Sequence, residues 1–421
     1  MHIWYIHPYA GGPGVGGIHR PYLLARAWQR SGHSATVILS SFHHLMPDGP
    51  LAEGLRDVEG VPYLMLRARP YRGNGLVRLL NMRDFCKGLR RLLPVLPAGV
   101  APPGAIIVSS PHPFPVHAGK RLADRFGVPL VFEIRDIWPA SITEIVATSR
   151  WHPFVMACAR TERFAYRHAD LIASVLPLAD QHLASLGFGD KPFVWVPNGA
   201  SLDDAPPQPI RSAAGSRAAA ALERWRGEGR RIIIHTGAMG PPNGLLELVE
   251  ELSGEPDERV SRGLTVLLAG SGSLAHEIEA RGAAALCPIA SVGEVPKSEV
   301  AALLARADIG YAGIRNIPAL YRYGVSLNKV AEYLAAGLVT YLPIAPCGDA
   351  VSQSGAGIAE PAQSPRDIRS ALIRLAALPP EERRRLGEKG QRYLSEHYDY
   401  DKIAARYSSA IAGCKTKRGT S

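Results

Sequence analysis

The chain has 421 residues, of which 46% are apolar, and it carries a formal net charge of +10 with a pI near 9.4. This length makes a single compact domain improbable and predicts two or three domains. The positive charge favours an anionic partner such as a nucleic acid, an acidic lipid or a phosphorylated small molecule. Composition alone does not choose between these partners.

The five cysteines are far apart in the sequence and never form a Cys-x-x-Cys pair. This pattern argues against a disulfide framework and against a zinc site, and it fits a reducing compartment. The sequence opens with a strand-like run without preceding basic residues or a cleavage site, and no apolar run is long enough to span a bilayer. We therefore expect a cytoplasmic protein that is not integral to a membrane.

The first half of the chain alternates short aliphatic runs with helical patterns. Strands are expected at HIWYI, ATVILS, AIIVSS, PLVFEI, LIASV and FVWV, with helices over 19–31, 115–126, 150–168 and 178–186. This alternation is typical of βαβ units and predicts a parallel sheet in an α/β domain.

A stretch rich in Pro, Ala, Gly and Ser at 197–216 predicts a connection between domains. The alternation then restarts with RIIIHTG, LTVLLAG, ALCPIAS, DIGYAGI and VTYLPI, and with helices over 244–252, 273–281, 298–306, 380–396 and 400–412. We divide the chain into domains at 1–200 and 201–396, and we expect the helix of the final segment, 397–421, to return to the first domain. Two doubly wound domains place a ligand cleft at the carboxyl ends of the strands and between the domains.

The loop after the first strand contains Gly12, Gly14 and Gly17 at the GxGxxG spacing of a dinucleotide site. However, no acidic residue stands near the end of the second strand, where such a site would hold the ribose. We therefore prefer a loop, including Gly16 and Gly17, whose amides and following helix start face a diphosphate, with Arg20 beside it. The alternative is a turn of no chemical consequence.

The most informative run is YRYGVSLNKVAEYLAAGLVTYLPI at 321–344, where Ser326, Asn328 and Lys329 cluster before Glu332. A polar cluster that leads into a buried helix is costly to desolvate unless a charged ligand lies against it. A nucleotide would supply that charge. Lys329 would pair with a phosphate, and Glu332, one turn later on the same face, would accept two ribose hydroxyls.

This run resembles the nucleotide-sugar motif of family 4 glycosyltransferases of the GT-B fold, in particular the branch of bacterial surface-polysaccharide enzymes. The resemblance continues, in the same order, through the glycine loop, YRGNGLVR, FEIRDIWPASI, VPNGAS, HTGAMGPPNG, LLAGSGS and SVGEVPKSEVAALLARADIGY. It implies two Rossmann-like doubly wound domains, with the acceptor on the first and the donor on the second. It also implies transfer of a hexose or N-acetylhexosamine from a nucleoside diphosphate sugar, with a UDP-sugar favoured, to a surface-polysaccharide or glycolipid hydroxyl, with retention of configuration.

The resemblance implies roles for individual residues, most of them at strand ends and in the loops that follow. The residues implied to contact the nucleotide sugar are Gly16, Gly17, Arg20, Asn198, Gly237, Gly240, Asn243, Gly272, Val295, Ser326, Asn328, Lys329 and Glu332. The sequence departs from the wider family in two places. Gly324 stands where the family has a first glutamate, and the family's Arg and Lys pair after Gly237 is replaced by PPN.

Acidic candidates for catalysis end a strand of the first domain in FEIRDIWP. At least one of Glu133 and Asp136 should point into the cleft, where an acid can orient or deprotonate an acceptor hydroxyl. The alternative is that Arg135 or another base pairs with them structurally. Lys329 completes the set of expected catalytic residues.

Two patterns imitate metal sites. Asp399 and Asp401 form a DxD sequence, but they immediately precede the last helix, where N-capping explains them. His112 and His117 have prolines between them, which prevent a helical ligand face. We expect no metal and no cofactor apart from the donor substrate.

A basic stretch over 67–91 has a single acid, Asp84, and is interleaved with Leu, Val, Met and Phe. It has two interpretations, an ordinary surface helix or a peripheral contact with the anionic inner face of the cell membrane. Nucleic acid is disfavoured because no aromatic-basic motif or recognition-helix pattern is present.

Two other functions stay open at this point. One is a nucleotide-sugar epimerase of the same fold. The other is a non-catalytic nucleotide-sugar-binding subunit, for which Gly324 and the missing Arg and Lys pair are the motive.

Overall fold

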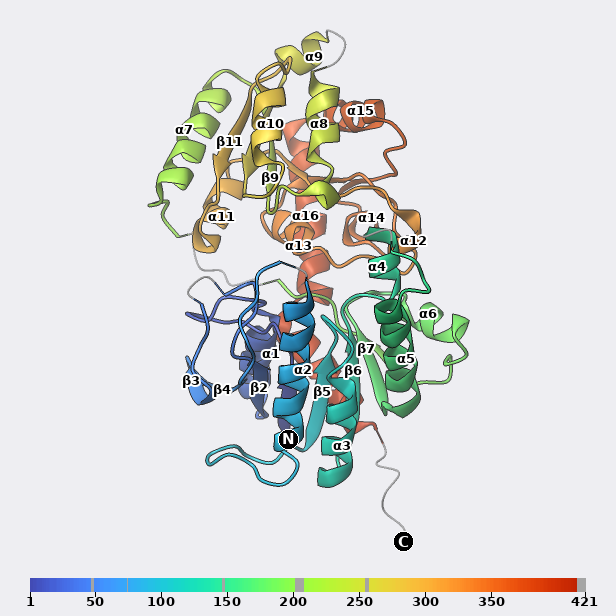
Figure 1. Ribbon diagram of the computed structural model, residues 1–421. Helices are drawn as coiled ribbons and strands as arrows, with labels where there is room; N and C mark the ends of the chain where they lie inside the picture. The colour runs from blue at the N-terminus through green and yellow to red at the C-terminus, as the bar shows by residue number, and fades with distance from the viewer. Residues whose placement is uncertain (47–48, 74, 146–147, 201–207, 254–256, 415–421) are drawn as a thin grey trace. The chain divides into compact units, whose positions relative to one another are not determined.

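Aliphatic strand runs alternate with helices along most of the chain in the computed structural model (Figure 1). The structure describes residues 1–421 with the exception of 47–48, 74, 146–147, 201–207, 254–256 and 415–421. Parts of the predicted connection at 197–216 and of the final segment 397–421 therefore lie outside the described residues. The chain divides into unit 1, Met1–Gly199 with Tyr400–Ser421, and unit 2, Ala200–Asp399.

The sheet of unit 1 has the strand order β3-β4-β2-β1-β5-β6-β7-β8. Its strands are β1 His2–Ile6, β2 Ser34–Ser40, β3 Gly54–Val58, β4 Val61–Leu66, β5 Ala105–Ser109, β6 Leu130–Ile134, β7 Leu171–Ser174 and β8 Phe193–Trp195. Every neighbouring pair is parallel except β3 with β4. Strands β5 and β6 are buried along their whole length, which is why their sequences are continuous apolar runs.

Helices cover both faces of this sheet. They are α1 Arg20–Arg30, α2 Leu76–Arg91, α3 Val116–Phe126, α4 Ala140–Ile145, α5 Pro153–His168, α6 Ala179–Ser185 and α17 Tyr400–Ala412. Helix α3 packs between α2 and α5 on one face, while α1 packs against α17 on the other (Figure 1). The indole of Trp28 fixes α17 there, because its Nε1 donates to the carbonyl of Ala404 at 3.1 Å.

The sheet of unit 2 is parallel, in the order β11-β10-β9-β12-β13-β14. Its strands are β9 Arg231–Thr236, β10 Leu264–Ala269, β11 Ile289–Gly293, β12 Ile309–Tyr311, β13 Val339–Leu342 and β14 Gly357–Ala359. Its helices are α7 Ala213–Gly227, α8 Leu245–Leu252, α9 Glu258–Ser261, α10 Ala275–Gly282, α11 Lys297–Leu304, α12 Pro318–Tyr321, α13 Asn328–Ala335, α14 Ala350–Ser354, α15 Pro365–Ala376 and α16 Pro380–His397, with a short 3-10 helix at Pro241–Asn243. The two sheets confirm the predicted α/β class.

The expected connection at 197–216 is wrong at its carboxyl end, where α7 begins. Ser212 is the N-cap of this helix, and its hydroxyl accepts from the amide of Gly215 at 3.0 Å. The Ala-rich run that follows has high helix propensity, which outweighs the loop-like composition. The β3–β4 hairpin was also not predicted, because β3 is mostly exposed and has no apolar run.

Candidate active site

The carboxyl edge of the second sheet is built from loops that lock into one another through their backbones. The amide of Gly237 donates to Ala269 at 2.9 Å, and the amide of Met239 donates to Ser271 at 2.8 Å. A Cβ on Gly272 would lie 2.5 Å from the carbonyl carbon of Met239. Gly272, predicted to contact the nucleotide sugar, is therefore needed for this close packing of the two loops.

The loop after β9 lies close to Lys329. Gly237 has a φ of +127°, which favours glycine, and a Cβ there would lie 4.0 Å from the Cε of Lys329. Gly240 has an ordinary φ of −112°, and a Cβ there would meet only the ring of Pro242, at 3.7 Å. The backbone therefore requires glycine at 237 and not at 240.

Lys329 lies in the first turn of α13 and reaches back to the loops. Its Nζ donates to the Oδ1 of Asn243 and to the carbonyl of Gly313, both at 2.9 Å. Burial lowers the pKa of Lys329 to about 8, although Glu332 acts in the opposite direction. An ammonium has three N–H donors, and the described contacts use two of them, so one donor is left for an anionic ligand.

Glu332 lies one turn after Lys329 and forms an ion pair with Lys297, the first residue of α11. This contact brings Glu332 next to the loop that contains Val295. The Lys297 side chain is 74% exposed, and exposed ion pairs contribute less than about 1 kcal/mol, so a ligand can displace it. Two further residues of unit 2 are predicted to contact the nucleotide sugar. Ser326 is half-buried, and Asn328 is exposed at the start of α13.

Two polar residues beneath this edge escaped the sequence reasoning. His235 is fully buried near the end of β9, with its Nδ1 3.1 Å from the carbonyl of Tyr311. Burial, together with the charge of Lys329, lowers its pKa to about 3, so the imidazole is neutral. The hydroxyl of Tyr333 accepts from the amide of Thr236 at 2.8 Å. The signal for His235 was available in RIIIHTG, where an apolar strand ends in polar residues and a glycine, and Tyr333 lies within the run at 321–344.

Gly324, where the wider family has its first glutamate, is buried and has a φ of +99°. A side chain rarely adopts this conformation, so glycine suits the backbone found here. The departure from the family pattern is therefore part of how this loop folds.

The glycine loop of unit 1 closes on itself. Bridges join Ala10 to Ile18 and Gly12 to Gly16, and the amide of Gly17 donates to Leu45 at 3.1 Å. Gly16 and Gly17 have φ values of 72° and 78°. Since several of its amides already donate within the protein, this geometry favours a conformational role for the loop over an anion-binding one.

Arg20 is only 4% exposed, and its guanidinium faces into the protein. Its Nη2 lies 3.2 Å from the Oε2 of Glu133 and donates to the carbonyl of Val196 at 2.7 Å, while its Nη1 donates to the carbonyl of Pro197. These contacts give Arg20 internal partners in place of the expected diphosphate.

Glu133 is completely buried and uses both carboxylate oxygens. Its Oε1 accepts from the hydroxyl of Tyr5 at 2.7 Å and from that of Ser109 at 2.8 Å. Burial alone would raise the pKa of Glu133, but Arg20, Arg135 and these hydrogen bonds outweigh it and hold the pKa below its ordinary value. The geometry favours the structural alternative for Glu133.

Asp136 and Asn198 lie nearby in unit 1. Asp136 follows β6 by two residues, and its side chain is exposed to solvent. The surrounding protein nevertheless desolvates its carboxyl and raises its pKa above the ordinary value, although the charge of Arg135 acts in the opposite direction. Asn198 is 8% exposed, and its Oδ1 accepts from Arg135 at 3.1 Å. Of the two predicted acids, Asp136 is the one that solvent reaches.

A cluster of aromatic rings surrounds Tyr9 at the carboxyl edge of the first sheet. The ring centroids of His43, His44 and His112 lie 5.7, 5.2 and 5.9 Å from that of Tyr9. The guanidinium of Arg78 lies 5.9 Å from the same ring. We call these five residues the Tyr9 cluster. The sequence pattern of His112 suggested only a metal ligand and did not predict this cluster. Among the described residues no three His, Cys, Asp or Glu are arranged to hold a metal.

The DxD sequence is divided between the two units. Asp401 lies in the first turn of α17 and pairs with Arg30 of α1 at 2.6 Å. Asp399 is the last residue of unit 2.

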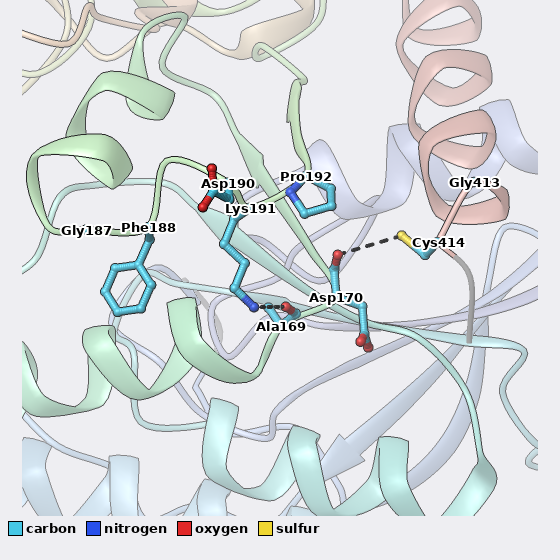
Figure 2. Close-up of a pocket in the computed structure, with 9 residues that line it drawn as sticks. All are labelled: Ala169, Asp170, Gly187, Phe188, Asp190, Lys191, Pro192, Gly413 and Cys414. Carbon is cyan, nitrogen blue, oxygen red and sulfur yellow. Dashed lines mark hydrogen bonds between the residues drawn. The ribbon is translucent and has the colours of Figure 1, made fainter. Parts of the chain in front are cut away.

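A separate hollow of about 580 Å³ lies at the opposite edge of the first sheet (Figure 2). It is lined by residues that precede β7 and β8 and by the end of α17, including Asp170, Lys191 and Cys414. The Nζ of Lys191 donates to the carbonyl of Ala169 at 3.0 Å within it. Its position at the amino ends of the strands separates it from every predicted site residue of unit 1.

Family comparisons match most of the chain. A glycosyl transferase 4-like domain matches residues 16–199, and a glycosyl transferase-like domain matches residues 242–409. Both halves of the chain belong to glycosyltransferase families. No curated protein matches this glycosyltransferase in sequence.

Solved structures share the fold of this glycosyltransferase. Sucrose-phosphate synthase from Thermosynechococcus elongatus has a TM-score of 0.71 at 16% identity, with 98% of each chain covered. The UDP-forming trehalose-phosphate synthase from Burkholderia vietnamiensis has a TM-score of 0.69 at 15% identity, covering 100% of this chain and 98% of the other. HepE from Anabaena, in complex with UDP and glucose, has a TM-score of 0.63 at 13% identity, with 98% and 99% covered. The fold is therefore GT-B, as predicted.

We expect the buried ion pair between Arg20 and Glu133 to contribute strongly to the stability of the glycosyltransferase. Glu133→Ala should lower the free energy of unfolding by about 3–5 kcal/mol, because Arg20 is left as an unpaired buried charge. Arg30→Ala, which removes the exposed pair with Asp401, should cost less than about 1 kcal/mol. Urea unfolding followed by tryptophan fluorescence reports mainly on unit 1, which holds every tryptophan except Trp225. Equal losses in the two variants would contradict a central role for the pair.

Proposed function

We propose that this glycosyltransferase transfers a hexose or N-acetylhexosamine from a UDP-sugar to a hydroxyl acceptor, with retention of configuration, in surface polysaccharide or glycolipid synthesis. The observation that carries the proposal is the convergence of Lys329, Asn243 and Glu332 at the carboxyl edge of the second sheet. A half-buried ammonium one helical turn from a carboxylate matches a diphosphate next to a ribose. The branch of bacterial surface-polysaccharide enzymes is part of this proposal and rests on the sequence motifs.

In the proposed reaction, the bond between the sugar C1 and the β-phosphate oxygen of the donor breaks, and a bond between C1 and the acceptor oxygen forms. The acceptor proton passes from that oxygen to the carboxylate of Asp136, and UDP departs with the bonding electrons. The Lys329 ammonium would stabilise the charge that develops on the diphosphate, since fixed charges in a partly buried site act strongly on a leaving group. No divalent metal is proposed for this step.

The choice of UDP is supported by the solved neighbours. HepE was crystallised with UDP and glucose, and the trehalose-phosphate synthase is described as UDP-forming. In this chain Glu332 would accept the ribose hydroxyls in place of Lys297, and the backbone of the loop at Val295 would receive the base.

The acceptor would bind at the carboxyl edge of the first sheet. Asp136 is exposed there and would orient the acceptor hydroxyl. Within the Tyr9 cluster, the exposed imidazole of His44 and the half-buried guanidinium of Arg78 would meet a glycan or a phosphate of a lipid-linked acceptor. A lipid-linked acceptor would place the enzyme in the cytoplasm, peripherally on the inner face of the cell membrane. Among the described residues no helix is long and apolar enough to cross a membrane.

Nucleotide binding tests the donor site. Glu332→Ala should weaken UDP binding about 10- to 100-fold, because two charge-assisted hydrogen bonds to the ribose are lost. The control is Glu388→Ala on α16, which removes a half-exposed glutamate and should leave affinity unchanged. Both variants should keep the wild-type Tm. Unchanged UDP affinity of Glu332→Ala by calorimetry would remove Glu332 from the site.

The pH dependence of UDP affinity tests Lys329. Burial lowers its pKa to about 8 in the free protein, so the side chain is charged below this pH and neutral above it. UDP affinity should be flat near pH 7 and should fall as pH rises through 8, approaching tenfold per unit. Lys329→Met should bind UDP more weakly and without this slope between pH 7 and 9. A flat wild-type profile would show that the ammonium does not meet the diphosphate.

Turnover distinguishes transfer from its rivals. In the presence of EDTA, wild type should release UDP from a UDP-sugar when lipid-linked or glycan acceptors are added, and Asp136→Asn should lower kcat by at least 100-fold with little change in UDP affinity. Interconversion of UDP-sugars without acceptor would identify an epimerase. Tight UDP-sugar binding without turnover on a broad acceptor panel would favour a non-catalytic subunit, and activity restored only by manganese or magnesium would overturn metal independence.

A further inference from the structure

Large apolar side chains are exposed at the carboxyl edge of the first sheet. In a βα unit the helix begins at the edge where its strand ends, so Leu76 at the start of α2 and Trp151 just before α5 belong to this edge. Leu76 is 70% exposed and Trp151 is 69% exposed. Leu45, in the connection after β2, is 41% exposed. Leu79, one turn after Leu76 on α2, is 39% exposed, so these two apolar side chains are neighbours and indicate a contact surface.

Helix α2 presents a row of side chains whose character changes along its length. Leu76, Leu79, Arg83, Lys87 and Arg90 are spaced three or four residues apart and therefore share one side of the helix. All five are exposed. The row is apolar where the helix begins at the carboxyl edge and basic from Arg83 onward. The opposite side of α2, with Asn81, Met82, Phe85 and Leu89, is buried in the protein.

The positive charge of this face extends over two further helices. Helix α2 has five Arg or Lys residues and one acid, and α3 and α5 each have three and one. The acids do not neutralise the surface. Asp84 pairs with Arg69 and Asp124 pairs with Lys120, both at 2.5 Å, while Glu162 is 4% exposed. The arginines of α5 at 160, 163 and 167 are exposed.

We propose that the outer surface of α2, α3 and α5, the basic helical face, docks on an anionic lipid bilayer. Leu76, Leu79 and Trp151 would enter the interfacial region, where leucine and tryptophan are favoured, and the arginines and lysines behind them would meet acidic headgroups. Apolar side chains at one end of a basic surface match a bilayer, in which acyl chains lie beneath charged headgroups. The phosphates of a nucleic acid would bind the arginines and lysines, but a nucleic acid would give the exposed leucines no role.

This docking would bring the carboxyl edge of the first sheet, with Asp136 and the Tyr9 cluster, to the surface of the bilayer. The surface is assigned from charge and exposure, and it deepens the proposed function by locating the peripheral membrane contact on three named helices. It holds whether or not the donor is a UDP-sugar.

Co-sedimentation of the full chain with vesicles tests the surface. The vesicles are phosphatidylcholine alone or a mixture with phosphatidylglycerol, and duplex RNA is a separate competitor. One variant combines Arg83→Ala, Lys87→Ala and Arg90→Ala, and another combines Leu76→Ser and Leu79→Ser. The matched charge control combines Arg262→Ala, Lys389→Ala and Arg392→Ala, all exposed residues of unit 2.

Wild type should pellet with anionic vesicles and only weakly with neutral ones. The basic variant should lose roughly 100-fold in partition coefficient at low salt, since each basic residue near an anionic surface contributes about fivefold. The leucine variant should lose at least about tenfold, and the unit 2 control should stay close to wild type. Raised salt should weaken binding of wild type more than that of the basic variant.

Three outcomes would overturn the proposal: no preference of wild type for anionic vesicles, equal losses in the basic variant and the unit 2 control, or release from vesicles by a low concentration of duplex RNA. UDP affinity is measured in parallel on every variant. Intact UDP binding with failed vesicle binding rejects the docking surface only, and intact vesicle binding without UDP binding rejects the donor assignment only.

Discussion

The buried ion pair between Arg20 and Glu133 is the interaction on which unit 1 depends. Glu133 lies on β6, accepts from Tyr5 of β1 and Ser109 of β5, and meets an arginine from the first turn of α1. That arginine also holds the carbonyls that follow β8, at the end of the first sheet. Two charges taken out of water are tolerated only when such partners satisfy them, so the pair fixes the ends of four strands and one helix at once. Asp136 is presented to solvent at the edge of this fixed arrangement.

The two carboxyl edges solve the problem of a polar site in different ways. In unit 1 the charges of Arg20 and Glu133 pair inside the protein, where Glu133 also accepts hydrogen bonds from two hydroxyls. Aromatic rings cluster around Tyr9 at the same edge. In unit 2 glycines bring the backbones of loops together, and one half-buried lysine supplies the charge. A lysine whose pKa burial has lowered is more sensitive to its surroundings than an arginine would be. The second edge is therefore the one whose charge depends on pH near neutrality.

Strands buried on both faces were predictable from the sequence, because continuous aliphatic runs such as those of β5 and β9 have few other uses. The exposed strand β3 and the Ala-rich helix α7 were not predictable in this way, because β3 has no apolar run and the start of α7 has the composition of a loop. Lys329 and Glu332 were found as a motif, but the contact of Lys329 with Asn243 joins residues far apart in the chain and required the fold. Glu133 and Asp136 look alike in sequence, and only the fold distinguishes them, because it buries Glu133 against Arg20, Tyr5 and Ser109 and leaves Asp136 exposed. The glycosyltransferase assignment is confirmed at the level of family and fold, while the finer branch stays a prediction.

The chain enters and leaves unit 2 at neighbouring points. Ala200, its first residue, forms a bridge with Asp399, its last, and the amide of Ala200 donates to Tyr398 at 2.9 Å. On the unit 1 side, a Cβ on Gly199 would touch the ring of Tyr400, so the two cut ends are close there too. In topological terms unit 2 is an insertion, closed at its base, within a sheet domain that is continuous without it. Because both ends of the insert lie together at its base, a segment of this kind can be replaced by another with similarly placed ends while the sheet of unit 1 stays continuous.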